Sequence, residues 1–126
     1  MKRDMDLIRA ILLYVEDADQ GDGFVRLMFP GVEFPDYEFD VLNGHKILLE
    51  DAGFVQPRRR LTGPILDFGA LTWAGHDFLD SVRDERVWLD TKEAAENAGG
   101  WTVDLLRDLA KGFVRTKIQK HTGIDL

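Results

Sequence analysis

The chain has 126 residues, 44% of them hydrophobic, and no cysteine, which fits one globular domain and excludes a disulfide framework or a thiolate metal site. Its formal net charge is −7, from 16 Lys and Arg against 23 Asp and Glu, whereas free-standing nucleic-acid binders are usually basic. Because no run approaches the roughly 20 apolar residues of a membrane span and the first residues lack a signal core, we expect a cytoplasmic protein without a membrane partner.

The first half of the chain predicts a helix, a strand and a second helix. An apolar stripe with helical spacing runs through residues 4–16, and alternation over 23–29 predicts a short strand. A helix is expected over 36–52, ended by Gly53, with Gly44 as a candidate break because glycine costs about 1 kcal/mol relative to alanine. Its expected core residues are Phe39, Leu42, Ile47, Leu48 and Leu49.

A hairpin of the size of a wing is expected next. Residues 54–57 read as one strand, residues 61–64 as a turn and residues 65–71 as the returning strand. Arg58, Arg59 and Arg60 lie at the end of the first strand and are the sharpest electrostatic feature of the chain. They could grip phosphate groups, or they could keep a solvated hairpin soluble.

Three helices are expected after the hairpin. Thr72 is a good N-cap for a helix over 73–83, and Asp90 or Thr91 is expected to cap a short helix that ends before Gly99 and Gly100. Thr102 is expected to cap a last helix over 103–120, whose apolar stripe must be buried on its own domain or on a second copy of the chain. That stripe comprises Val103, Leu106, Leu109, Ala110, Phe113, Val114 and Ile118.

Two stretches resemble a known family. Met-Lys-Arg-Asp-Met-Asp-Leu-Ile-Arg opens the chain, and residues 71–80 read Leu-Thr-Trp-Ala-Gly-His-Asp-Phe-Leu-Asp, followed by Arg83-Asp84 and Val87-Trp88. These motifs resemble the domain of unknown function 2513 family, a small bacterial and prophage family. The resemblance implies a winged-helix-like fold. We therefore expect an α+β fold, a winged helix-turn-helix domain over residues 1–82 with a C-terminal two-helix extension over 83–126.

Catalytic and metal motifs are few. Ser81 is the only serine, and no phosphate-binding glycine loop or metalloprotease motif occurs. His76 and Asp80 share a helix face but supply only two ligands, and Arg115 and His121 lie in an ordinary basic helix end. We therefore expect a protein that is not an enzyme and takes no cofactor or metal.

Two functions remain. The first is a DNA-binding transcriptional regulator of prophage or mobile-element type, used as a dimer through the last helix. Its expected contacts with duplex DNA are Arg58, Arg59 and Arg60 on phosphate and Asn43, His45 and Lys46 in the groove. Acidic residues on or beside the same helix would repel a duplex unless they face away from it.

The second is a protein–protein module, such as a phage-encoded inhibitor or DNA mimic. Residues 1–53 hold 12 acidic against 5 basic side chains and could dock on a basic host protein such as a nucleic-acid enzyme. The expected contacts are Asp36, Glu38, Asp40, Trp88 and Trp101. Alternatively, the three tryptophans, Trp73 among them, anchor the last helices to the domain.

Overall fold

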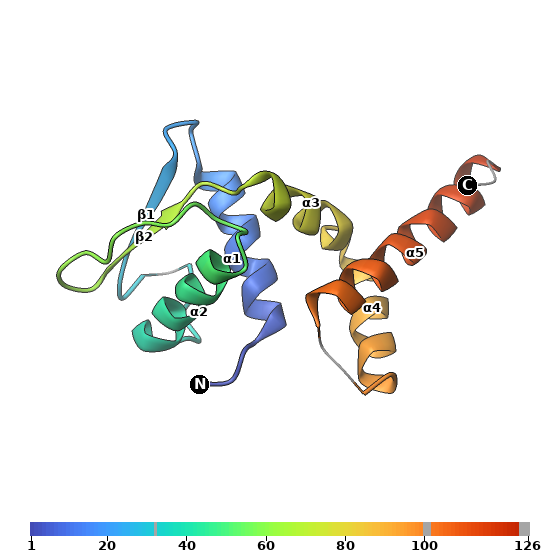
Figure 1. The fold of residues 1–126 in the computed structure, drawn as a ribbon, viewed down its shortest axis with the longest axis horizontal. Helices are drawn as coiled ribbons and strands as arrows, with labels where there is room; N and C mark the ends of the chain where they lie inside the picture. Colours follow the sequence, from blue (N-terminus) through green and yellow to red (C-terminus); the bar gives the residue numbers. More distant parts are fainter. Residues whose placement is uncertain (32, 100–101, 124–126) are drawn as a thin grey trace. The chain divides into compact units, whose positions relative to one another are not determined.

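The computed structural model describes residues 1–31, 33–99 and 102–123, and within the last range it leaves the side chains of Val103 and Arg107 undescribed. The described chain is α+β, with five helices and a two-stranded antiparallel sheet (Figure 1). It divides into two compact units, residues 1–76 and 77–126. The elements are α1 (Met5–Ala18), β1 (Phe24–Met28), α2 (Phe39–Asp51), β2 (Ile65–Gly69), α3 (Trp73–Val82), α4 (Glu85–Asn97) and α5 (Val103–Thr122).

The first helix, α1, forms as its apolar stripe predicts. Asp4 caps it, since the carboxylate of Asp4 accepts a hydrogen bond of 3.1 Å from the amide of Leu7. One face of α1 is buried along its length and contacts α2. The buried residues are Met5, Leu7, Ile8, Ile11, Leu12 and Val15. This face is the largest contribution of any one helix to the core of the first unit.

The sheet pairs β1 with β2 rather than joining the two sides of the expected hairpin. The strands are antiparallel, with Val25 opposite Phe68 and Leu27 opposite Leu66, and these four side chains form the buried face. Alternation along β1 leaves Arg26 and Met28 exposed on the other face. The expected strand over 23–29 is confirmed, and the strand over 65–71 is confirmed with a different partner.

The first side of the expected hairpin is not a strand. Residues 54–57 pair with the segment that follows β2, through an isolated bridge between Val55 and Leu71. Its hydrogen bonds run from the amide of Gln56 to Ala70 at 2.9 Å and from the amide of Thr72 to Phe54 at 3.0 Å. Pro57 carries no amide hydrogen, so it cannot continue a ladder. The amide of Arg58 instead donates a hydrogen bond to the carboxylate of Glu50 on α2. The prediction of a wing-sized hairpin was therefore wrong for its first strand, residues 54–57.

Helix α2 begins three residues later than expected and runs through Gly44 without a break. Its buried face consists of Leu42, His45, Lys46 and Leu49, whereas Ile47, expected in the core, is 48% exposed. Gly53 ends the helix with a positive φ of 74°, its amide bonding to Glu50. The amide of Phe54 reaches Leu49, so the end is a Schellman motif as Gly53 predicted.

The helix boundaries in the second half follow their caps. Thr72 caps α3 as expected, its hydroxyl accepting from the amide of Gly75. Helix α4 starts earlier than expected, because Asp84 is its N-cap and Thr91 is buried inside it. Gly99 follows α4 with a φ of 78°, and Thr102 caps α5 as expected. Gly100 lies outside the described residues.

In the second unit, α5 packs against α4 (Figure 1). Leu106 and Ala110 of the expected stripe are buried, whereas Ile118 near its end is 39% exposed. Trp88 is buried on α4, but Trp73 on α3 is 90% exposed, so the expected anchoring role of Trp73 is wrong. No described helix is both long and apolar enough to cross a membrane.

Candidate functional site

The face of the sheet that points away from the core carries charge. Arg26 and Asp67 are directly opposite each other across the two strands. The Nε atom of Arg26 lies 3.9 Å from Oδ1 of Asp67, and the Arg26 side chain is 54% exposed while that of Asp67 is 3% exposed. A buried carboxylate requires charged or hydrogen-bonding partners. Arginines from two segments supply them.

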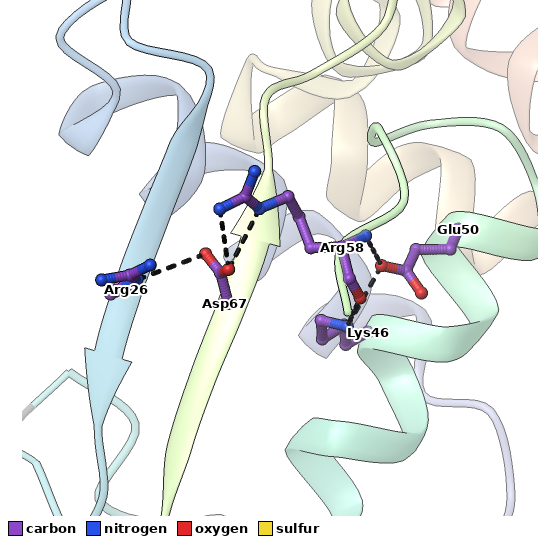
Figure 2. Close-up of polar contacts among 5 residues, drawn as sticks. All are labelled: Arg26, Lys46, Glu50, Arg58 and Asp67. Atoms are coloured by element: carbon purple, nitrogen blue, oxygen red, sulfur yellow. Dashed lines mark hydrogen bonds and ion pairs between the residues drawn. The ribbon is translucent and has the colours of Figure 1, made fainter. Parts of the chain in front are cut away.

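Arg58 is the stronger partner of Asp67 (Figure 2). Its Nε and Nη2 atoms lie 3.0 Å and 2.9 Å from Oδ2 of Asp67, and its side chain is 35% exposed. The other oxygen, Oδ1, accepts no hydrogen bond from a described residue and lies 3.9 Å from Nε of Arg26. Both guanidinium groups also lie 5.0 Å from the centre of the Phe24 ring. Asp67 and Phe24 therefore hold two arginines on one face.

The backbone of Arg58 is fixed from the other side by α2. Lys46 donates a 2.8 Å hydrogen bond to the Arg58 carbonyl, and Glu50 accepts one of 2.9 Å from the Arg58 amide. Lys46 and Glu50 themselves form an ion pair of 3.1 Å (Figure 2). The segment at Arg58 is thus held to α2 through its backbone and to β2 through its side chain.

The next two arginines follow Arg58 directly along the chain. Arg59 and Arg60 are exposed. A pocket of about 210 Å³ lies where Arg59 meets the sheet, lined by Arg26, Pro57, Arg58, Arg59, Leu61 and Asp67. We call Arg26, Arg58, Arg59 and Arg60 the arginine surface. Two of its guanidinium groups, those of Arg26 and Arg58, contact the carboxylate of Asp67, and Arg59 lines the same pocket. A surface with this charge suits an anion such as a phosphate diester.

The structure corrects the expected groove contacts on α2. His45 is fully buried, and its Nε2 accepts a 2.9 Å bond from the amide of Asp4 while its Nδ1 lies 2.8 Å from the carbonyl of Val41. Lys46 is 3% exposed and bound to Arg58 and Glu50. Neither side chain is placed to reach a base edge. Asn43 is partly exposed.

The expected acidic contacts are placed differently. Asp36, Glu38 and Asp40 are exposed around the start of α2. Trp88 is buried at 3% exposure and does not form an exposed partner surface. Trp101 lies outside the described residues. Among the described residues of the expected protein-binding surface, the three acids are therefore the ones open to a partner.

Two residues of the site, Arg26 and Asp67, were missed by the sequence analysis. Each occupies the polar position of an alternating strand, and this is the signal that marks the outer face of a sheet. The chain alone does not say that their strands are neighbours, because residues 54–57 were the expected partner of residues 65–71. Their pairing follows only from the observed register.

His76 pairs with a carboxylate on α1. Its Nδ1 lies 3.5 Å from a carboxylate oxygen of Glu16, and its side chain is 52% exposed. Asp80, which shares a helix face with His76 and was considered with it as a metal ligand, forms an ion pair of 2.7 Å with Arg83. Among the residues that the structure describes, no group of three histidines or acids could hold a metal ion.

Comparison with known proteins identifies the family. The family model described as "Hypothetical protein (DUF2513)" matches residues 2–101, which include the whole arginine surface and α1 to α4. An uncharacterized protein of Haemophilus influenzae is 32% identical over 122 residues, covering 95% of this chain and 98% of the relative. No solved structure matches the chain. The resemblance seen in the opening residues and in residues 71–88 is confirmed, and the chain belongs to the DUF2513 family of hypothetical proteins.

Proposed function

We propose that this protein is a non-enzymatic DNA-binding regulator that contacts the phosphate backbone of a duplex through the arginine surface. The observation that carries the proposal is the placement of Arg58: its backbone is held by α2 and its side chain by Asp67. Arg59 and Arg60 follow this fixed residue directly along the chain, and both are exposed. A backbone segment held in this way loses little freedom when its arginines bind phosphate.

The order of elements in the first unit supports a winged-helix-like domain as the scaffold. Helix α1, strand β1, helix α2, the strand-like residues 54–56 and strand β2 follow one another in a winged-helix-like order, with one described helix between β1 and residues 54–56 where a helix-turn-helix has two, and α3 comes after β2. On this assignment, residues 57–64 take the place of the wing. A wing contacts the backbone or the minor groove, which suits arginine.

The outer face of α2 argues against groove reading by that helix. Asp40, Ile47 and Asp51 are its exposed residues, and they include two carboxylates and no cation. Carboxylates on this face would repel phosphate. We therefore propose backbone contact by the arginine surface and leave His45 and Lys46 out of it.

Charge reversal tests the proposal. The double variant Arg59→Glu/Arg60→Glu should lose at least about tenfold in affinity for a random-sequence duplex at low salt, measured by fluorescence anisotropy. The matched control, Arg86→Glu/Lys120→Glu, makes the same change in net charge on α4 and α5 and should bind nearly as the wild type does. Equal losses in both variants, or no binding by the wild type, would overturn the proposal.

A second candidate is favoured by the same α2 face. Exposed Ile47 lies between Asp40 and Asp51, and Asp36 and Glu38 continue the acidic region. An apolar centre with an acidic rim fits a basic protein surface. The variant Asp40→Lys/Asp51→Lys separates the two functions, because it should abolish a protein contact and strengthen DNA binding.

A further inference from the structure

One exposed stripe on α5 is divided by charge. Asp104, Asp108, Lys111 and Arg115 are spaced four, three and four residues apart, so they share one face of the helix. All four side chains are exposed. We call these four residues the α5 charge stripe. Its two acids precede its two bases along the chain.

The α5 charge stripe lies on the side of the helix away from α4. Leu106 and Ala110 are fully buried, and residue 106 lies about 200° around the helix from residue 104. The side of α5 that contacts α4 is therefore roughly opposite the stripe. The stripe is exposed to solvent, so its charges are accessible to another molecule.

Acids followed by bases make a surface that is complementary to itself. If a second copy of α5 lies antiparallel across the first, with a two-fold axis between residues 109 and 110, Asp104 faces Arg115 of the other copy. Asp108 then faces Lys111 of the other copy. A two-fold interface requires this kind of self-complementarity, because the same patch serves both chains.

An apolar groove runs beside the basic half of the stripe. Its volume is about 350 Å³, and Val114 and Ile118 of α5 supply its apolar side chains. Ile118 is 39% exposed although it belongs to the apolar stripe of the helix. Lys111 and Arg115 line one part of this groove and Asp77, Asp80 and Ser81 another. A second copy would cover the apolar side chains that the chain itself leaves open.

We propose that two copies of the chain associate through antiparallel α5 helices, with the α5 charge stripes paired across a two-fold axis and Val114 and Ile118 covered beside them. This dimer would join two arginine surfaces in one molecule, so it adds to the proposed function but does not depend on it. Neither charge pair involves a residue of the first unit.

The same order of charges would also favour a single helix, since acids suit its start and bases its end. Paired variants distinguish the two effects. Asp104→Lys/Asp108→Lys makes the stripe wholly basic, and Lys111→Glu/Arg115→Glu makes it wholly acidic. Each variant alone brings like charges together in a dimer, whereas a mixture of the two restores opposite charges.

The experiment is sedimentation equilibrium of the full chain over a wide concentration range. The wild type should reach twice the chain mass of 14.4 kDa. Each variant alone should raise the dimer dissociation constant at least about tenfold, and an equimolar mixture should return it toward the wild-type value. Lys2→Glu/Lys120→Glu changes the net charge like the acidic variant but lies outside the stripe, so it should dimerise normally.

Far-UV circular dichroism of each variant checks that α5 stays helical. A wild type that remains a monomer throughout the range would overturn the proposal. So would a dimer that both variants leave intact, or a mixture of well-folded variants that stays monomeric. Because DNA is absent from the experiment, failure here leaves the DNA-binding proposal standing, and loss of DNA binding leaves the dimer standing.

Discussion

Arg58 donates a hydrogen bond of 3.0 Å from Nε to one oxygen of the buried Asp67, and its Nη2 lies 2.9 Å from the same oxygen in an ion pair. This pair joins the irregular segment after Pro57 to the sheet. Arg26 reaches the same carboxylate only at 3.9 Å from the neighbouring strand. Asp67 therefore serves to position the arginines, and Arg58 is more a structural residue than a free ligand for phosphate.

The first prediction follows from this division of roles. Arg58→Ala should destabilise the first unit by about 1–3 kcal/mol, because it removes the closest ion pair and a hydrogen bond of a buried carboxylate. Arg26→Ala should destabilise it by less, because Arg26 is half exposed and makes a longer ion pair. Urea unfolding of both variants measures the difference. Equal losses of unfolding free energy in the two variants would contradict a special structural role for Arg58.

His45 supplies a second prediction. The amide of Asp4 can only donate, so Nε2 of His45 accepts and the ring hydrogen lies on Nδ1, directed to the carbonyl of Val41. His45→Ala should cost about 2–4 kcal/mol, because it leaves a cavity and an unpaired amide at the start of α1. Chemical denaturation measures the loss, and NMR of the ring nitrogens measures the tautomer. A ring with its hydrogen on Nε2 would contradict the assignment.

The surroundings of two glycines predict opposite effects when each glycine is replaced by alanine. A Cβ at Gly75 on α3 would overlap the carbonyl of Phe54, whereas a Cβ at Gly112 on α5 would meet nothing within 4 Å. Gly75→Ala should therefore destabilise the chain by about 1–3 kcal/mol or more. Gly112→Ala should stabilise it by up to about 1 kcal/mol, since alanine favours helix. Thermal unfolding compares them, and a change of the same sign in both would refute the contact at Gly75.

Asp84 predicts how the second unit responds to acid. The hydrogen bond from Lys117, at 2.5 Å, and the amide of Val87 lower the pKa of Asp84 below its ordinary value. A carboxyl whose pKa is lower in the folded state stabilises that state above its unfolded pKa of about 3.9, and this stabilisation is lost as the pH falls through the folded pKa.

The variant Asp84→Asn isolates that contribution. Asparagine caps a helix about as well as aspartate, so the loss reflects the charge that faces Lys117. The variant should be less stable than the wild type at neutral pH, and the difference should shrink as the pH falls below about 4. Thermal unfolding over a pH series measures it. A difference that is constant with pH would point to the cap rather than to the ion pair.

Helical spacing predicted much of the fold. On α2 the same spacing also indicates which side chains are buried, and the sequence analysis did not use it there. Leu42 and Leu49 fix one face of that helix, and His45 and Lys46 lie three and four residues after Leu42 on the same face. Polarity suggested that these two side chains were exposed and that Ile47 was buried. The positions in the helix show the reverse, because His45 and Lys46 have buried partners.

The sheet could not be predicted in the same way. Alternation in residues 23–29 and 65–71 indicated two strands, but pairing between distant strands is not encoded in either one. Pro57 was the available warning that residues 54–57 would not form a full ladder strand. The three arginines after it stand out in the sequence itself, whereas the juxtaposition of Arg26 and Asp67 required the observed register.

The dependence of DNA binding on salt tests the central claim most directly. Each phosphate contact contributes about 0.9 to the slope of log affinity against log salt. The neutral variant Arg59→Gln/Arg60→Gln should therefore bind a random duplex with a slope shallower by about 2 per bound chain. An unchanged slope, or a wild type that does not bind at low salt, would contradict the arginine surface as a phosphate-binding site and direct attention to the acidic face of α2.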